Sequence, residues 1–197
     1  MVIIGLTGSI AMGKSETARM FRENGIPVFD ADQTVHELYR EGGKAVEPVG
    51  RLFPEAIKEG AVDRAALSGL VLGDKSTLVK LEAIVHPLVQ EERQSFLDSA
   101  RNEGNDIAVL DIPLLFETGG SELVDHIVVV SAPAELQKKR ALERPGMTLE
   151  KFEQILAKQV PDRTKREKAD FIVDSSKGLA AANEQVRDII TQLRNSS

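Results

Sequence analysis

Short, almost continuous apolar runs alternate along the chain with longer segments whose apolar residues recur every three or four positions. The runs favour buried strands, and the recurring positions predict amphipathic helices. Runs with almost no polar alternation are typical of a sheet that is covered on both faces. The five predicted strands are 2–6, 26–29, 107–111, 126–131 and 171–174. Strands that alternate with helices predict a three-layer α/β fold with a mostly parallel, five-stranded sheet.

The stretch from about 42 to 105 departs from this alternation because it contains only helical spacing. The spacing predicts one helix over 46–53, another with Asp63 as its N-cap, and a third over 74–85. Pro87 is expected to end the third helix and to open a new one. The insertion is too long for a simple crossover between strands, so we predict a lid-like or substrate-binding subdomain.

Composition narrows the class of protein. The chain has 197 residues, about the length of one domain, and no low-complexity linker divides it. Its net charge is −6 with acidic and basic residues mixed throughout, so nucleic acid is not expected as a partner. Cysteine is absent, which excludes disulfides and thiolate metal sites. No apolar run is long enough to cross a bilayer and no charged leader precedes the first run, so we expect a cytoplasmic protein.

The first strand leads directly into a glycine-rich segment with a lysine. Residues 8–15 fit the pattern G-x-x-x-x-G-K-[ST], and the helical spacing that follows ends near Gly25. Backbone N–H groups in such a loop converge on phosphate oxygens, and the helix N-terminus adds partial positive charge. Lys14 would reach the β- and γ-phosphates of a nucleotide, and the Ser15 hydroxyl would ligate Mg²⁺. The residues expected to bind the nucleotide here are Gly8, Ala11, Met12, Gly13, Lys14, Ser15 and Glu16.

Two residues of this segment are unusual for such a loop. Ala11 stands where glycine is frequent, and its methyl group disfavours a positive φ. Glu16 stands where a hydroxyl residue is common; its carboxylate suits the helix dipole but carries the same charge as phosphate. We expect the two residues to weaken nucleotide affinity without changing the reaction.

Aspartates stand at or just after the ends of two predicted strands. Asp30 and Asp32 follow the second strand, and Asp111 ends the third. Ligands of open α/β sheets bind at the carboxyl ends of the strands. One of the first two aspartates is expected to cap the following helix, and the other to face the site as a general base. Asp111 is expected in the magnesium or nucleophile region.

Basic residues gather in the segment from about 140 to 168. Arg140 and Arg144 precede a predicted helix, and a second basic cluster with Lys165 follows it. A mobile flap with arginines at both ends would screen the transferring phosphoryl group and exclude water. His86, by contrast, is a single histidine whose role is more often structural than functional.

Together these stretches resemble the dephospho-coenzyme A kinase family over nearly the whole chain. The resemblance rests on the segments 6–8 with 13–15, 30–32 with His36, 86–87, 111–117, 140–159 and 171–174. It implies a P-loop nucleoside triphosphate hydrolase-like fold and a single kinase domain over 1–197. Within that domain it implies a helical acceptor-binding subdomain over about 42–105 and a lid over about 140–168.

The resemblance also implies the reaction and the role of each residue. ATP with Mg²⁺ would phosphorylate the ribose 3′-hydroxyl of dephospho-coenzyme A, the last step of coenzyme A synthesis. Asp32 would accept or orient the hydroxyl proton, and Lys14 and Arg140 would stabilise the phosphoryl oxygens. Ser15 would hold Mg²⁺, with Asp111 helping through water. The remaining assignments are Arg144 to the nucleotide, His86 and Arg93 to the acceptor, and the turn after Asp174 to adenine.

Three other functions remain open at this point. Another small-molecule kinase could act on a nucleoside, a nucleoside monophosphate or a sugar. A nucleotide-dependent switch is a second reading, although the chain lacks the Asn-Lys-x-Asp tetrad that guanine-specific switches usually carry. A scaffold that binds nucleotide without catalysis is a third. The assembly is expected to be a monomer or a small homo-oligomer.

Overall fold

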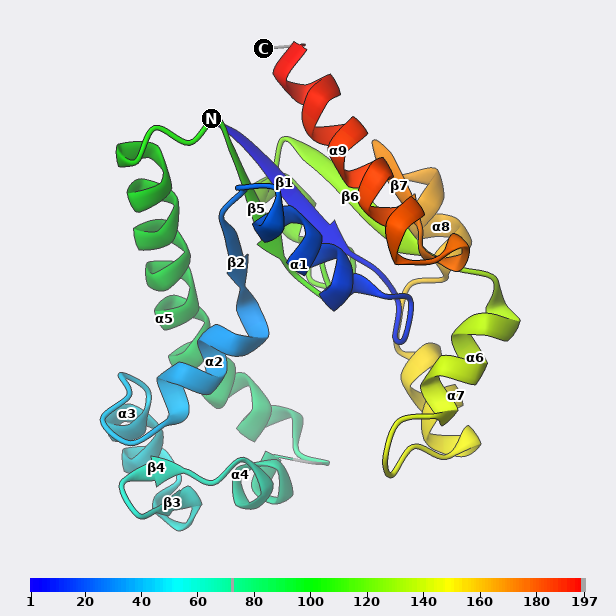
Figure 1. Ribbon diagram of the computed structural model, residues 1–197. Coiled ribbons are helices and arrows are strands. Elements are labelled where there is room, and N and C mark those ends of the chain that lie inside the picture. Colours follow the sequence, from blue (N-terminus) through cyan, green and yellow to red (C-terminus); the bar gives the residue numbers. More distant parts are fainter. Residues whose placement is uncertain (72, 196–197) are drawn as a thin grey trace. The chain divides into compact units, whose positions relative to one another are not determined.

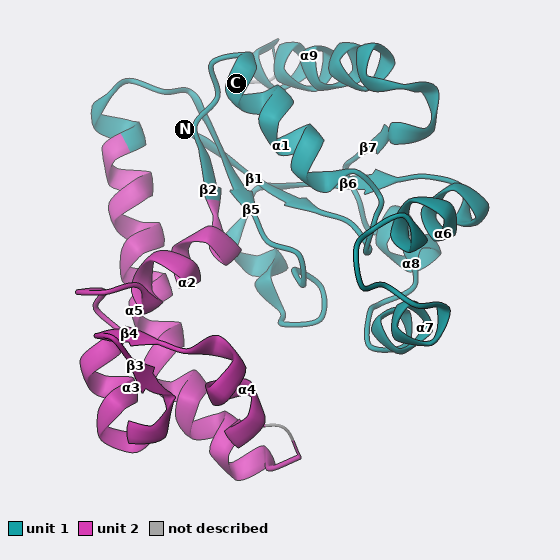
Figure 2. Ribbon diagram, turned by 60° about the horizontal axis from the view of Figure 1, so that its bottom comes forward, with its two compact units in different colours: residues 1–29, 100–197 teal, residues 30–99 magenta. Residues whose placement is uncertain are grey.

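The computed structural model describes residues 1–71 and 73–195 (Figure 1). The chain forms two compact units (Figure 2). The first comprises residues 1–29 together with those from 100 onward, and the second comprises Asp30–Ser99. The second unit overlaps the helical subdomain expected over about 42–105, whose role as an acceptor-binding subdomain stays a prediction.

A five-stranded parallel sheet forms the centre of the first unit. The strand order is β2-β5-β1-β6-β7. Leu6 lies opposite Asp111 on one side of β1, and Ser131 of β6 lies opposite Asp174 of β7, so the carboxyl ends of neighbouring strands meet at one edge. The strands are β1 (Val2–Thr7), β2 (Val28–Asp30), β5 (Ile107–Asp111), β6 (His126–Ser131) and β7 (Phe171–Asp174). The predicted five-stranded parallel sheet is confirmed.

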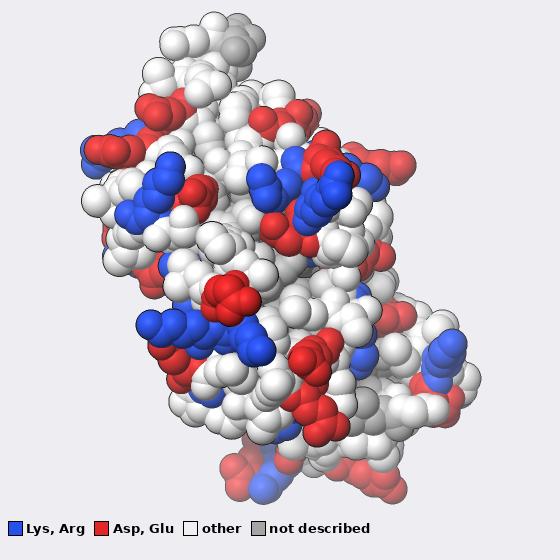
Figure 3. All heavy atoms as spheres, turned by 90° about the vertical axis from the view of Figure 1, so that its right-hand side faces the viewer, with Lys and Arg blue, Asp and Glu red and all other residues white. Residues whose placement is uncertain are grey.

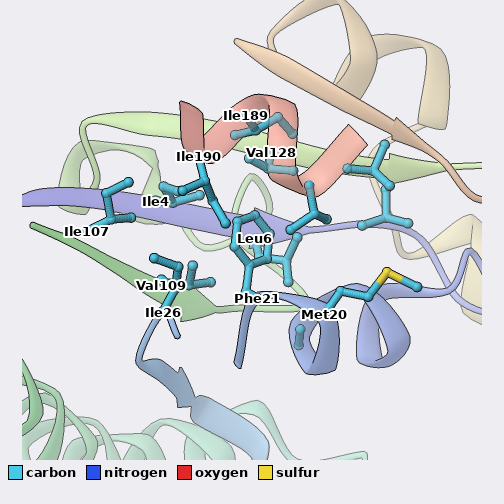
Figure 4. Packing of buried hydrophobic residues seen from close by; sticks show 14 of the residues in the cluster. Ile4, Leu6, Met20, Phe21, Ile26, Ile107, Val109, Val128, Ile189 and Ile190 are labelled. Carbon is cyan, nitrogen blue, oxygen red and sulfur yellow. The ribbon is translucent and has the colours of Figure 1, made fainter. Parts of the chain in front are cut away.

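Helices cover this sheet. Side chains of α1 and α9 pack with those of the strands in one buried cluster (Figure 4). Phe21 of α1 is fully buried, and burial of such a side chain contributes about 1.5–3 kcal/mol. This packing anchors the helix that follows the glycine-rich segment. The helices of the unit are α1 (Lys14–Glu23), α6 (Ala134–Leu142), α7 (Leu149–Ala157), α8 (Asp162–Glu167) and α9 (Leu179–Asn195), with 3-10 turns η2 (Gly120–Leu123) and η3 (Ser175–Lys177).

The second unit is mostly helical and has its own core. Leu38 and Tyr39 of α2 are buried in a cluster with residues of the later helices, which is why α2 belongs to this unit. Asp63 caps α4 by accepting hydrogen bonds from the N–H groups of Ala65 and Ala66, as predicted. The elements are α2 (Ala31–Tyr39), α3 (Val46–Leu52), η1 (Pro54–Ala56), β3 (Ile57–Lys58), β4 (Ala61–Val62), α4 (Arg64–Val71) and α5 (Lys75–Asn102), whose last turn belongs to the first unit.

One prediction for this unit is wrong, and one of its elements was not predicted. Pro87 does not end a helix, because α5 runs through it from Lys75 to Asn102. Buried or partly buried apolar residues on both sides of Pro87 pack in the same cluster, and this packing outweighs the lost hydrogen bond. The antiparallel hairpin of β3 and β4 was not anticipated, because strands of two residues carry no periodicity.

None of the helices among the described residues combines the length and the apolar character that are required to cross a membrane.

Candidate functional site

The glycine-rich segment joins β1 to α1, as its pattern predicts. Gly13 has a φ of 98°, which L-amino acids with side chains rarely adopt. A Cβ on Gly8 would lie 2.7 Å from the carbonyl oxygen of Val130, so a side chain cannot be accommodated there without movement of β6. Both glycines of the motif are therefore required by the backbone path. The loop has the strand–turn–helix context of a phosphate-binding loop.

Lys14 and Asp111 meet at the edge of the sheet. The Lys14 Nζ donates a hydrogen bond to Asp111 Oδ1 in a close ion pair. Asp111 is almost fully buried at the end of β5, and Lys14 opens α1 after the neighbouring strand β1. The register of the two strands thus brings together a cation for phosphate and a carboxylate, as expected from their positions.

Ser15 lies exposed at the second residue of α1. No group of three His, Cys, Asp or Glu side chains that could enclose a metal ion occurs among residues 1–71 and 73–195. The Ser15 hydroxyl, next to Lys14 in the chain, and the Asp111 carboxylate, paired with Lys14, are two oxygen donors near the loop. Hard oxygen donors of this kind are those that Mg²⁺ prefers.

Arg140 lies on α6 and is bound to the turn after β7. Its Nη1 donates to the Ser175 hydroxyl and its Nη2 to the Ser175 carbonyl, both at 2.8 Å. The Ser175 hydroxyl in turn donates to the Met12 carbonyl at 2.6 Å. Arg140 is thus connected to the phosphate-binding loop through one residue. Sequence reasoning placed the turn after Asp174 near the site but did not identify Ser175.

The tip of the loop is held by two glutamines. The Ile10 N–H donates to Gln159 Oε1 at 3.0 Å, and Gln137 Nε2 donates to the Ile10 carbonyl at 2.9 Å. Gln137 comes from α6, and Gln159 follows α7. Both backbone groups of one loop residue are therefore paired with this helical segment. Gln159 ends the segment 140–159 on which the resemblance rests, but neither glutamine was assigned a contact, because their partners are backbone groups far away along the chain.

Ala11 has a structural role at the same tip. It adopts a φ of 62° and is buried in a small apolar cluster with Ala141 of α6 and Phe152 of α7. Its methyl group therefore packs against the helices as well as bordering the loop. The expected effect of this methyl group on nucleotide affinity stays a prediction.

Glu16 lies in the first turn of α1, where an acidic side chain suits the helix dipole. Its carboxylate accepts a hydrogen bond from Arg19 Nη2 at 2.7 Å. The Glu16–Arg19 pair holds the pKa of Arg19 above its usual value. Arg19 offsets part of the negative charge of Glu16, and the expected loss of nucleotide affinity through Glu16 stays a prediction.

The second basic cluster differs from expectation at Lys165. This side chain is fully buried, and its Nζ lies 2.9 Å from Glu117 Oε1. The same oxygen accepts a hydrogen bond from the Val160 N–H at 2.8 Å. Burial raises the pKa of Glu117, but the bonds from Lys165 and Val160 outweigh it and leave the pKa below its usual value. Lys165 therefore differs from the exposed arginines of the expected flap, because its partner lies on a distant segment that no local pattern reveals. The flap itself stays a prediction.

Charges on the surface around α6 to α9 are mixed. On the face shown in Figure 3, lysines and arginines are interspersed with aspartates and glutamates. Arg144 is exposed in the turn after α6, and Arg163 pairs with Glu167 at 2.8 Å. At the turn after β7, hydrogen bonds from Ser176 hold the pKa of Asp174 below its usual value.

The second unit contains the remaining predicted residues. Asp30 is the N-cap of α2 and accepts a hydrogen bond from the Gln33 N–H at 2.9 Å. Asp32 is exposed in the first turn of α2, and its carboxylate forms no hydrogen bond with another described residue. His86 and Arg93 both lie on α5, two helical turns apart and therefore on one face. The structure thus separates the capping aspartate from the one that is available for chemistry.

The chain has extensive similarity to known proteins. Residues 2–181 match the family model described as dephospho-CoA kinase. The dephospho-CoA kinase of Mesorhizobium japonicum is 56% identical over 194 residues, which are 98% of either chain. A crystal structure from Thermus thermophilus has a TM-score of 0.83 at 34% identity and covers 97% of this chain and 96% of that one. The dephospho-CoA kinase of Campylobacter jejuni shares the fold, with a TM-score of 0.66 at 23% identity over 97% and 96% of the two chains.

Proposed function

Because this chain belongs to the dephospho-CoA kinase family, we propose that it transfers the γ-phosphoryl group of ATP to the ribose 3′-hydroxyl of dephospho-CoA, which gives CoA. The bond between the γ-phosphorus and its bridging oxygen breaks while the bond to the ribose oxygen forms. The hydroxyl proton passes to a base, and ADP leaves. The observation that supports this reaction most strongly is the family match over residues 2–181.

The nucleotide end of the reaction falls to the first unit. Phosphoryl transfer needs little covalent chemistry from the protein, so placement and charge stabilisation dominate. The N–H groups of the loop and the Lys14 ammonium bind the β- and γ-phosphates. Arg140, held beside the loop through Ser175, stabilises the charge on the transferring group. Arg144, exposed after α6, binds the nucleotide from the same segment.

Mg²⁺ belongs to this proposal as the partner of ATP. In phosphoryl-transfer sites the ion takes one or two protein oxygens and completes its shell with phosphate oxygens and water. Ser15 and Asp111 supply that number of oxygen donors, so the residues fit the ion, and these two would hold it. When bound, Mg²⁺ neutralises charge on the β- and γ-phosphates.

The acceptor end falls to the helical unit, Asp30–Ser99. Asp32 accepts the 3′-hydroxyl proton, which is consistent with a carboxylate that is exposed and has no other partner among the described residues. His86 and Arg93 share one face of α5 and suit the diphosphate of dephospho-CoA. The helical segment over about 140–168 acts as the lid over the nucleotide.

The wider setting follows from the substrates. Both are small molecules, and a net charge of −6 with interspersed surface charges favours such partners over nucleic acid. We propose a cytoplasmic location, which suits a reaction that consumes ATP, and a monomer or small homo-oligomer as the assembly.

A coupled assay of ADP release tests the reaction and the acceptor together. Mg-ATP is supplied with dephospho-CoA, adenosine, AMP or no acceptor. Turnover with dephospho-CoA alone is the expected result. Turnover with AMP or adenosine instead would retain a kinase but reject this acceptor. ATP binding without turnover on any acceptor would favour a switch or a scaffold.

A further inference from the structure

The hydroxyl group of Ser175 lies between two parts of the nucleotide site that come from different elements. It accepts a hydrogen bond from Arg140 Nη1 at 2.8 Å and donates one to the Met12 carbonyl at 2.6 Å. The Ser175 carbonyl accepts a further bond from Arg140 Nη2 at 2.8 Å. Ser175 itself lies outside the phosphate-loop motif, in the turn η3 that follows β7.

The bonds to Arg140 fix the plane of its guanidinium group. Two separate nitrogens of the fork bind two oxygens of one residue, so the group can neither rotate nor translate without breaking a bond. An arginine side chain otherwise has many rotamers, and holding it in place before the reaction removes that entropic cost from the transition state. Arg140 is therefore preorganised by Ser175.

The bond to Met12 orients the loop. Peptide bonds in the described chain are trans, so the Met12 carbonyl and the Gly13 N–H point in opposite directions. When Ser175 holds the carbonyl, the Gly13 N–H is directed away from Ser175. This N–H forms no hydrogen bond with another described residue. Close packing supports the arrangement, since a Cβ on Gly13 would lie 3.2 Å from the Ser175 Cβ.

We propose that Ser175 is a positioning residue for phosphoryl transfer, which sets the Arg140 guanidinium and the Gly13 N–H in one fixed geometry. The inference rests on the proposed function, because it takes Arg140 to act on the transferring group. The hydrogen bonds of Ser175 act on different kinetic parameters. Those with Arg140 affect kcat, and the one with the Met12 carbonyl affects the KM for ATP.

The test is a double-mutant cycle of Ser175→Ala with Arg140→Ala, in which kcat and the KM for ATP are measured with dephospho-CoA as acceptor. Ser175→Ala should lower kcat about tenfold and raise the KM for ATP about threefold, as expected for the loss of a hydrogen bond in a transition-state contact. In the Arg140→Ala background it should lower kcat less than about twofold, because the group it positions is gone. The rise in KM should persist there, because it passes through Met12.

Thr191→Val provides the matched control. It removes a hydroxyl group that also donates to a backbone carbonyl, that of Arg187 at 2.9 Å, from an exposed position on α9 that makes no hydrogen bond to Arg140 or Met12. Both kinetic parameters should stay within about twofold of those of the unmodified protein.

Three results would overturn the inference. If Ser175→Ala left kcat and KM unchanged while Arg140→Ala lowered kcat, the positioning role of Ser175 would be rejected and the proposed function would stand. An equal loss of kcat in both backgrounds would show that Ser175 acts independently of Arg140. Unchanged kcat for Arg140→Ala would reject the proposed role of Arg140, and the positioning role with it.

Discussion

At the scale of single residues, Asp30 and Asp32 show that two identical side chains at the start of one helix can have different roles. The Asp30 carboxylate binds the N–H of Gln33, which satisfies a donor that the helix leaves unpaired. Asp32 lies exposed two residues further on, more than half a helical turn away, and its carboxylate has no such bond. Loss of the first carboxylate affects α2, whereas loss of the second affects the proton transfer that we propose.

Asp32→Asn should therefore reduce kcat by about 10²–10⁴-fold, the usual contribution of a general base. The KM for ATP should change less than about twofold, because the nucleotide is assigned to the other unit. Steady-state kinetics with dephospho-CoA measure both parameters. Asp30→Asn is the control, since asparagine is an equally good N-cap, and it should retain nearly full activity. Activity of Asp32→Asn within about threefold of the unmodified protein would remove the base role.

At the scale of elements, α5 shows a helix that continues through a proline. Pro87 cannot donate a backbone hydrogen bond, and its ring crowds the preceding turn. Leu81 and Val85 before it, and Leu88 and Val89 after it, all pack in the core of the helical unit. The packing of these residues therefore keeps α5 helical although the proline is locally unfavourable.

Removal of this strain should stabilise the protein. Pro87→Ala restores the missing N–H, and we expect the free energy of unfolding to rise by about 1–3 kcal/mol. Urea denaturation measures the change. Pro48→Ala is the matched control, because Pro48 stands in the first turn of α3, where the N–H has no helical partner, and it should have little effect. If Pro87→Ala left stability unchanged, α5 would carry no strain at the proline.

At the scale of the whole molecule, a buried ion pair joins segments that are distant in sequence. Glu117 follows β5, whereas Lys165 lies on α8 and Val160 precedes it. Asp162 of α8 also accepts a hydrogen bond from the Ser131 hydroxyl at 2.8 Å, which ties the same helix to the end of β6. The end of the proposed lid is thus fixed to the sheet.

Glu117→Gln should lower the free energy of unfolding by about 3 kcal/mol at neutral pH, because it leaves the fully buried Lys165 without its counter-charge. Chemical denaturation measures this loss. The paired replacement Glu117→Leu with Lys165→Met removes both charges and should recover much of the stability. A loss in the double variant as large as in Glu117→Gln would show that the ion pair is not the cause.

The same pair predicts a dependence on pH. The pKa of Glu117 in the folded protein lies below its ordinary value of 4.5. Its contribution to stability is therefore fully present above that value and is lost as the pH falls through the folded-state pKa. The difference in unfolding free energy between the unmodified protein and Glu117→Gln should shrink as the pH is lowered below about 4.5. A difference that stayed constant down to pH 3 would contradict this.

Much of the fold and part of the site follow from local pattern. The apolar runs predict all five strands of the sheet, and the glycine motif predicts the loop because both depend on neighbours in sequence. Asp111 could be placed beside Lys14 because parallel strands end at one edge. These inferences need only periodicity and topology.

The remaining features depend on contacts between distant residues. The buried Lys165 is paired with Glu117, and no residue near Lys165 in the sequence indicates this partner. Ser175, Gln137 and Gln159 act on backbone groups of the loop, so no complementary side chain marks them. Pro87 is retained within α5 by tertiary packing, which local propensity does not include.

The two hydrogen bonds that Gln137 and Gln159 make with the backbone of Ile10 have a thermodynamic consequence. The helical segment of α6 and α7 holds both backbone groups of this residue and shares an apolar cluster with Ala11, so the segment and the loop tip cannot rearrange separately. A ligand that binds one conformation of the loop more tightly must therefore shift the helical segment toward the conformation that goes with it. A ligand of the segment must shift the loop by the same coupling free energy. A substitution at Gln137 or Gln159 would then weaken the coupling between the loop and the segment.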